Sequence, residues 1–287
     1  MSKMRLIVRW HGEKDPISLK QYAQIPNLYG IVTSLYHLPL GVEWEEEAIR
    51  SLVRKVESYG LKLELVDSFR IHEDIKRGYD TRDALIENYK KNIRMLAKCG
   101  VKLALHPDDP PRPIFGLPRI AKNVEDYRRI LGYRESPANA ITFCCGSFGS
   151  GAENDMPAMI REFGKEKIPF VHFRNIKRME DGSFYECGHV TESGSSDMGE
   201  VMRALHDIGF DGYLRPDHGR RIWDEAWRVE KTVLPDGTQV EEHRPDGFGG
   251  VKPADGYGLF DRALGAMYAV GLWEGISKQK QADGRKE

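Results

Sequence analysis

Four side chains that can bind a metal ion recur at similar intervals along the sequence. Each stands at the end of a short apolar run, and they are His106, Cys144, His172 and Asp217. Imidazole nitrogen, thiolate sulfur and carboxylate oxygen are ligands of divalent cations. Cys145 follows Cys144 directly, and the pattern alone does not separate the two thiols. We therefore predict a metal site built from these four positions.

The apolar runs that carry these side chains alternate with amphipathic helices. The runs that we predict as strands are 5–10, 30–36, 61–69, 101–106, 140–144, 169–174 and 212–217. Alternation of this kind predicts a parallel sheet, either open or closed into a barrel. No G-x-G-x-x-G motif follows the first strand, so a dinucleotide-binding domain is unsupported. Ligands bind at the carboxyl ends of parallel strands, and the four side chains are therefore expected to meet there.

Three arginines accompany the predicted ligands. Arg174 and Arg215 each lie two residues from one of them, on the same face of a strand, and Arg9 lies at the end of the first strand. Arginine binds carboxylates through two parallel hydrogen bonds, so these residues predict a substrate that is an acid. The alternative is that Arg174 and Arg215 pair with carboxylates of the protein, such as Glu64 or Asp67.

Three further residues are candidates for contact with substrate. His218 directly follows Asp217 in "RPDHGR" and is placed to act as a general acid or base. Tyr257 lies in "DGYG" before the last predicted helix, where it either faces the site or packs. His72 lies just past a predicted strand, at the edge where substrate would bind.

Composition limits the classes of protein that fit. The 43 basic and 44 acidic residues nearly balance, which argues against nucleic-acid or membrane-surface binding through bulk charge. We find no apolar run long enough to span a bilayer and no signal peptide. The four cysteines show no C-x-x-C pair and no disulfide spacing, so we expect a cytoplasmic protein.

We expect one domain over residues 1–276. Within it, residues 228–258 break the rhythm of strands and helices and contain a predicted hairpin around Pro235-Asp236-Gly237, which we expect to form a lid over the mouth of the domain. Residues 277–287 offer little to bury and are expected to be disordered.

The stretches "HPDDPP", "TFCCGS", "HFRN", "HVTESGSSDM" and "RPDHGR" resemble the mannonate dehydratase family, which belongs to the xylose-isomerase-like TIM barrels. The resemblance runs through nearly the whole chain. It implies a (β/α) barrel and a Mn²⁺ ion, which we expect Fe²⁺ or Co²⁺ to be able to replace. We also expect a homodimer. It also implies dehydration of D-mannonate to 2-keto-3-deoxy-D-gluconate in glucuronate catabolism.

Residue by residue, the resemblance assigns the metal to His106, Cys144, His172 and Asp217. The family usually has Thr at the position of Cys145, which favours Cys144 as the ligand. His218 and Tyr257 take the acid/base and substrate-facing places of the family.

One departure from the family concerns the wall of the barrel. Relatives carry a further strand, loop and helices after "LAKCG", whereas here Gly100 runs directly into Val101. We count seven strands, and a barrel of this kind has eight. Either the barrel closes imperfectly, a partner fills the gap, or residues have been lost at this point. Two other functions therefore stay open, namely an inactive paralogue and a metal-dependent sugar isomerase or epimerase.

Overall fold

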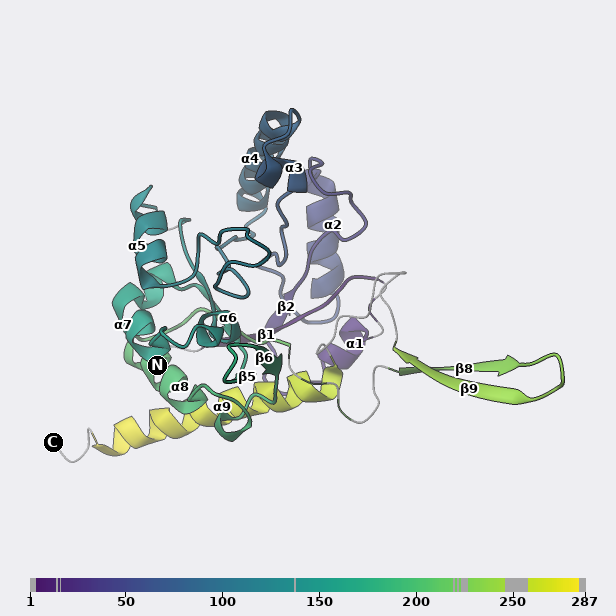
Figure 1. Cartoon of the computed structure of the whole chain (residues 1–287). Helices are drawn as coiled ribbons and strands as arrows, with labels where there is room; N and C mark the ends of the chain where they lie inside the picture. Colours follow the sequence, from purple (N-terminus) through teal and green to yellow (C-terminus); the bar gives the residue numbers. More distant parts are fainter. Residues whose placement is uncertain are drawn as a thin grey trace.

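Strands and helices alternate along the chain in the computed structural model, as the sequence predicts (Figure 1). The structure describes residues 4–13, 15, 17–136, 138–218, 220, 222, 227–245 and 258–283. Five parallel strands form the main sheet in the order β2-β1-β7-β4-β3. Their bounds are Arg5–Arg9 (β1), Gly30–Val32 (β2), Thr142–Cys144 (β3), Phe170–Phe173 (β4) and Tyr213–Pro216 (β7).

Two further extended segments join the edges of this sheet through isolated parallel bridges. In segment 61–66, Lys62 pairs with Gly30 of β2 and Val66 with Thr33, just after β2. In segment 101–105, Leu105 pairs with Ile141, just before β3. A single bridge, Leu65 to Lys102, links the two segments to each other. The pairing thus passes through seven segments in sequence order and returns from β7 to β1. The fold is a TIM-type barrel, and all seven predicted strands belong to its ring.

Helices surround the ring. Their bounds are Leu19–Tyr22 (α1), Glu46–Glu57 (α2), Glu73–Arg77 (α3), Arg82–Lys98 (α4), Val124–Gly132 (α5), Cys145–Ser150 (α6), Met156–Lys167 (α7), Met198–Asp207 (α8) and Leu259–Asp283 (α9), with a 3₁₀ turn at Thr191–Ser193. Several begin at a side chain that accepts a hydrogen bond from the first turn, such as Asp155 at α7 and Asp197 at α8. These caps satisfy amide groups that otherwise lack partners.

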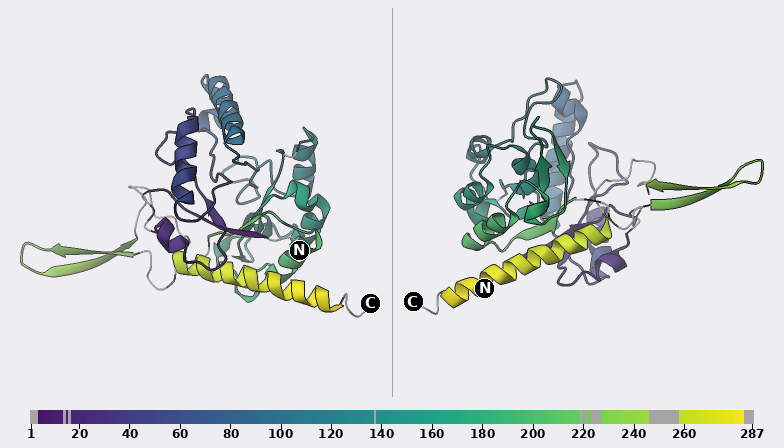
Figure 2. Two further views of the ribbon diagram at one scale, coloured as in Figure 1. Left: turned by 180° about the vertical axis from the view of Figure 1, so that it is seen from behind. Right: turned by 60° about the horizontal axis from the view of Figure 1, so that its bottom comes forward.

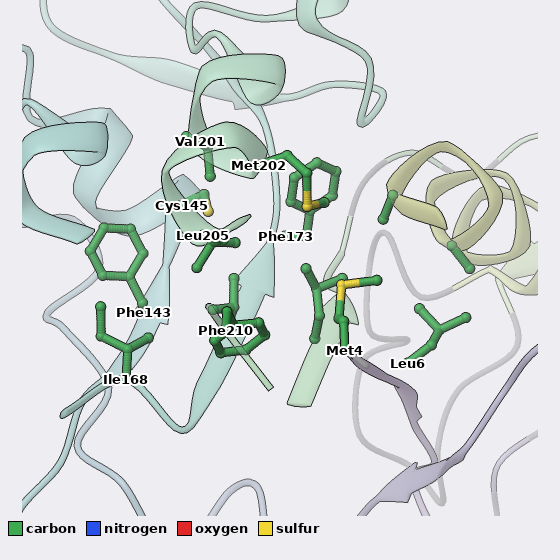
Figure 3. Close-up of a cluster of buried hydrophobic side chains, with 14 of the residues drawn as sticks. Met4, Leu6, Phe143, Cys145, Ile168, Phe173, Val201, Met202, Leu205 and Phe210 are labelled. Carbon is green, nitrogen blue, oxygen red and sulfur yellow. The ribbon is translucent and has the colours of Figure 1, made fainter. Parts of the chain in front are cut away.

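Alternate strand residues fill two apolar layers. Outside the ring, Phe143 and Phe173 lie in one apolar cluster with Val201 and Leu205 of α8, and Leu6 belongs to the same cluster on the side of α9 (Figure 3). Inside the ring lies a smaller cluster, which contains Ile7, Val32, Leu65, Phe170 and Tyr213. Because both faces of the parallel strands are buried, the strands read as continuous apolar runs in the sequence.

The junction at Gly100 is a regular helix end. Gly100 has φ of +75°, its N–H donates to Ala97, and the N–H of Val101 donates to Leu96 over 2.9 Å. These two bonds form a Schellman motif, for which a left-handed residue, usually glycine, is required. The chain therefore passes from α4 into the next segment of the ring without distortion. We call the contact between segments 61–66 and 101–105 the seam.

We predict that the seam is the least protected part of the ring. It is held by the N–H of Lys102 donating to Glu64 at 3.0 Å and that of Val66 donating to Lys102 at 3.4 Å, whereas β4 and β7 pair over four residues each. Amides at the seam should exchange at least about tenfold faster than those of β4, because local opening there breaks few bonds. Hydrogen exchange with mass spectrometry checks this, and equal protection in both regions would contradict it.

Two antiparallel hairpins extend beyond the ring. The first joins β5 (Ile176–Arg178) to β6 (Phe184–Glu186). The second joins β8 (Trp227–Val233) to β9 (Gln239–Pro245), which confirms the predicted hairpin around Asp236. The lid expectation is not met by this hairpin, which projects away from the barrel instead of covering its mouth (Figures 1 and 2). The rest of the excursion, residues 246–257, lies outside the described residues.

The prediction that residues 277–287 are disordered is wrong for residues 277–283, which belong to a helix. Helix α9 continues through this segment and runs along the barrel beside α8 (Figure 2). Nε2 of His206 lies 3.1 Å from the hydroxyl of Ser277, and Lys280 pairs with Asp207 at 2.6 Å. We predicted disorder because this segment has few apolar side chains to bury. In the structure, these polar contacts to α8 hold it in a helix instead. Among the described helices, none combines the length and apolar composition needed to cross a membrane.

Candidate metal centre

The carboxyl ends of the ring segments surround a cavity of about 480 Å³. Its lining includes the following predicted site residues: Arg9, His106, His172, Arg174, Arg215, Asp217 and His218. The strands bring these residues together because their parallel register places the ends of β3, β4 and β7 at one level. Cys144 is the partner of His172 in that register, and His172 is the partner of Arg215.

Three of the four predicted ligands form a compact cluster. The nearest ligand atoms of His106, Cys144 and His172 all lie within 4.8 Å of one another. The two imidazole rings are 4.9 Å apart between centroids. A cation with ligand bonds of about 2.0–2.3 Å fits between donors at such separations. The cluster is therefore suited to a divalent ion that accepts nitrogen and sulfur ligands.

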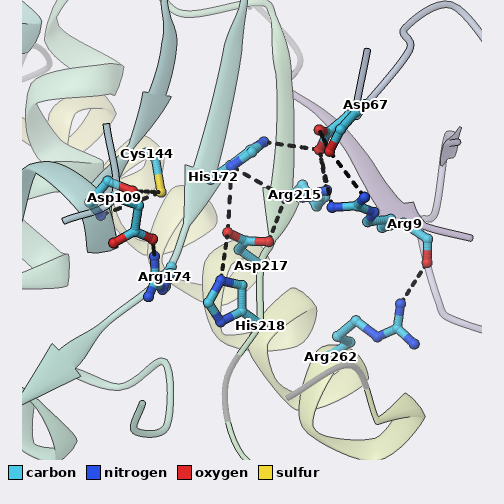
Figure 4. A network of polar contacts seen from close by, with 12 residues as sticks. Arg9, Asp67, Asp109, Cys144, His172, Arg174, Arg215, Asp217, His218 and Arg262 are labelled. Carbon is cyan, nitrogen blue, oxygen red and sulfur yellow. Dashed lines mark hydrogen bonds and ion pairs between the residues drawn. The ribbon is translucent and has the colours of Figure 1, made fainter. Parts of the chain in front are cut away.

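The structure separates the two adjacent cysteines. Cys144 ends β3 and points toward the imidazoles (Figure 4), and its sulfur accepts from the Ser147 hydroxyl at 3.2 Å. Burial opposes ionisation, but His106 and His172 hold the pKa of Cys144 well below its usual value. Burial raises the pKa of Cys145, whose side chain packs in the outer apolar core. Cys144 is thus the thiol able to act as a ligand, since thiolate is the binding form.

His172 has an unsatisfied nitrogen. Its side chain is 2% exposed, and Nε2 is buried without a hydrogen bond, although an oxygen of Asp67 lies 3.5 Å away. Nδ1 of the ring lies 3.4 Å from an oxygen of Asp217. Buried polar atoms normally have hydrogen bonds, so an imidazole nitrogen that has only a long contact to Asp67 and lies beside a thiolate supports a metal site.

Asp217 lies at the edge of this cluster. Its carboxylate contacts His172 and accepts from Arg215 at 2.5 Å (Figure 4). Burial alone would raise the pKa of Asp217, but Arg215, His218 and His172 together hold it well below its usual value. An ionised, buried carboxylate is available to a cation. Its role as fourth ligand stays a prediction.

The predicted substrate-binding arginines contact carboxylates of the protein. Arg215 donates to Asp67 at 2.5 Å as well as to Asp217, which matches the alternative that named Asp67. The guanidinium of Arg9 lies 4.0 Å from the same Asp67. Glu64, the other carboxylate named, bonds to tyrosines instead. Substrate binding by these arginines stays a prediction.

Arg174 is held by two carboxylates. Its Nη1 donates to Asp109 at 2.5 Å, and its Nε donates to Glu186 at 3.0 Å. The side chain is only 3% exposed. As with Arg215, the groups that hold the guanidinium belong to the protein, and Arg174 remains a predicted rather than an observed substrate contact.

Of the predicted site residues that the structure describes, His72 is not brought to this cluster. His72 caps α3, where Nδ1 accepts from the Asp74 N–H at 3.1 Å, and it lines a separate cavity of about 50 Å³. Tyr257 lies outside the described residues.

Three carboxylates of the site were not among the predicted site residues. Asp67 lies near the end of the predicted strand 61–69, so the same strand-end rule indicates it, although it entered only as a possible arginine partner. Asp109 lies in a proline-rich loop, and Glu186 lies on the β5–β6 hairpin. Asp109 does follow a ring segment, three residues after His106, although it was not selected as a site residue. Glu186 follows no ring strand, and the sequence carries no comparable signal for it.

Comparison with known proteins decides the family. The model of the D-mannonate dehydratase family matches residues 4–103 and 99–235. The chain belongs to this family. A mannonate dehydratase from Thermotoga maritima is 37% identical over 383 aligned positions, which cover 97% of this chain and 99% of that protein. "Mannonate dehydratase 1" from Bacillus licheniformis is 33% identical, with 97% of each chain covered.

Solved structures agree with this assignment. The crystal structure of mannonate dehydratase from Streptococcus suis serotype 2 has a TM-score of 0.82 and 32% identity, and covers 97% of this chain and 96% of that one. A xylose isomerase domain protein from Alicyclobacillus acidocaldarius has a TM-score of 0.52 at 10% identity, covering 95% of this chain and 99% of that one. That likeness shows the fold alone.

The comparisons also locate the departure from the dehydratase family. The family model matches in two blocks that meet between residues 99 and 103, which is where Gly100 joins Val101. The alignment of 383 positions is longer than the chain of 287 residues, so the relatives carry positions that this chain lacks. The seam therefore lies where relatives have additional sequence.

Proposed function

We infer that this protein catalyses the dehydration of D-mannonate to 2-keto-3-deoxy-D-gluconate, a step of glucuronate catabolism. The observation that carries the inference is membership of the mannonate dehydratase family over nearly the whole chain. The clustered His106, Cys144 and His172 support it, because they could hold a metal ion beside a cavity large enough for a sugar acid.

We propose that the cluster, with Asp217 as fourth ligand, holds Mn²⁺, and that Fe²⁺ or Co²⁺ can replace it. The imidazoles and the carboxylate suit Mn²⁺, whereas the thiolate of Cys144 is a soft ligand for it, which is why we propose Fe²⁺ and Co²⁺ as replacements. When bound, a divalent ion would polarise the substrate carboxylate and stabilise the charge that develops at C2. Arg215 keeps Asp217 ionised and oriented for this role. Arg9 and Arg174 line the cavity and would add positive charge beside the acid group.

The reaction needs one group to remove the C2 proton and one to protonate the departing C3 hydroxyl. Loss of the proton and of water leaves an enol, which converts to the 2-keto product without further help. His218 lines the cavity beside Asp217, and we propose that it carries out one of the two proton transfers. We propose Tyr257 for the other, and His72 as a more distant contact to substrate.

We further propose that the protein is a cytoplasmic homodimer. Phe115, Leu117 and Ile120 support an assembly, because their side chains are 98%, 66% and 74% exposed on one loop. The four free cysteines support a reducing compartment. Light scattering during size-exclusion chromatography tests the dimer, and a monomeric mass would contradict it.

Removal of the metal tests the proposed function directly. Treatment with a chelator should abolish formation of the 2-keto-3-deoxy acid from D-mannonate, since no other group in the cluster offers comparable charge stabilisation. Adding back single ions should restore activity with Mn²⁺, Fe²⁺ or Co²⁺. The assay measures the 2-keto acid, with an aldose and a ketose as control substrates. Equal turnover by metal-free protein, or isomerisation of the control sugars instead, would contradict the proposal.

A further inference from the structure

Glu186 approaches His218 from outside the ring. It is the last residue of β6, and the β5–β6 hairpin carries it back over the carboxyl ends of β4 and β7. One oxygen of Glu186 lies 2.9 Å from Nδ1 of His218. The other imidazole nitrogen, Nε2, lies 3.7 Å from an oxygen of Asp217. The two nitrogens of His218 thus face different partners, one on the hairpin and one at the metal cluster.

The position of Glu186 is itself fixed by Arg174. Both nitrogens at one edge of the guanidinium, Nε and Nη2, donate to the two oxygens of Glu186, and Nη1 donates to Asp109. This two-point contact sets the plane of the Glu186 carboxylate, so that one oxygen is directed at His218. The side chain of Glu186 is 27% exposed, which limits screening of the contact by water.

Space for this arrangement comes from a glycine. A Cβ added to Gly146, in the first turn of α6, would lie 2.3 Å from Cδ of Arg174. Any side chain at this position would displace Arg174. Gly146 therefore has a steric role, because its lack of a side chain lets Arg174 lie across the start of α6.

We propose that Glu186 is a positioning residue for His218. By accepting a hydrogen bond from Nδ1–H, the carboxylate selects the tautomer in which the Nε2 lone pair faces the metal cluster and the substrate. Nε2 of His218, the nitrogen that faces Asp217, can then exchange a proton with the substrate. Arg174 and Gly146 keep Glu186 in place. The inference rests on the proposed role of His218 in D-mannonate dehydration.

Two substitutions test the role of Glu186. Glu186→Ala should lower kcat about 10–100-fold, the range seen when an orienting hydrogen bond to an active-site histidine is lost. Its KM for D-mannonate and its metal content should stay within about twofold of wild type. Glu186→Gln should recover most of the lost kcat, because the amide oxygen still accepts from Nδ1. Tyr185→Ala, at the neighbouring and exposed position of β6, is the matched control and should keep wild-type kcat.

A spectroscopic measurement separates this inference from the proposed function. In protein labelled with ¹⁵N-histidine and loaded with diamagnetic Zn²⁺, His218 should show a protonated Nδ1 and an unprotonated Nε2. Glu186→Ala should mix the tautomers, and Tyr185→Ala should not. An unchanged tautomer and an unchanged kcat in Glu186→Ala would overturn the inference, as would a loss of activity that arises from lost metal. Absence of mannonate turnover in the wild type would instead refute the proposed function and leave the tautomer measurement valid.

Discussion

Cys144→Ala is expected to remove both metal binding and turnover. The thiolate is the ligand contributed by β3, it is fully buried, and it lies beside both imidazoles of the cluster. Without it, the site retains two imidazole nitrogens and the proposed carboxylate ligand, and we expect the affinity for a divalent ion to fall more than about 100-fold, beyond the range for residues that only support a ligand. Metal analysis of the purified variant and the mannonate assay check the two effects together.

Cys145→Ala is the matched control for this prediction. The two thiols are adjacent, equally buried and of the same volume, but Cys145 packs among apolar side chains. Its replacement should cost on the order of 1 kcal/mol of folding free energy through lost packing and leave metal content unchanged. If Cys145→Ala lost the metal while Cys144→Ala kept it, the assignment of the ligand would be reversed.

His218→Asn should retain the metal and lose turnover. The side chain lies next to Asp217 but outside the three-residue cluster, so the ligand set survives the substitution. Asparagine preserves a polar group of similar size but cannot exchange a proton near neutral pH. Loss of one general acid or base typically lowers the rate about 10²–10⁴-fold. Steady-state kinetics on protein of measured metal content would detect a decrease of this size.

His206→Asn controls for the loss of a histidine in general. His206 lies on α8 and contacts Ser277 of α9, away from the cavity. We expect wild-type kcat from this variant and at most a small loss of stability. Full turnover by His218→Asn would show that His218 takes no part in proton transfer.

The metal cluster could be predicted from sequence because the fold converts position along the chain into position in space. A polar residue at the end of a buried parallel strand lies at the rim: Cys144 ends β3, His172 is the penultimate residue of β4, and His106 directly follows segment 101–105. The choice between Cys144 and Cys145 needed the structure, or the resemblance to a family. Alternation places one of two adjacent side chains inside the ring without saying which one.

Other features depend on contacts that no local pattern encodes. Glu186 reaches the site through an antiparallel hairpin outside the ring, and its meeting with His218 depends on where that hairpin folds. The last residues of α9 have the composition of a disordered tail, yet contacts from Ser277 and Lys280 to α8 hold them in a helix. The arginines were located correctly at the rim, but their carboxylate partners come from loops that sequence periodicity does not describe.

The seam has a consequence for how a bound ion is retained. Cys144 and His172 stand on β3 and β4, and Asp217 directly follows β7; β4 pairs with β3 over three residues and with β7 over four. His106 directly follows segment 101–105, which meets each of its two neighbours through one isolated bridge. Of the four predicted ligands, His106 is therefore the one attached to the most weakly paired segment of the ring. Inserting the relatives' additional sequence between Gly100 and Val101 should strengthen the pairing of that segment and slow dissociation of the cation, while leaving the other three predicted ligands in place.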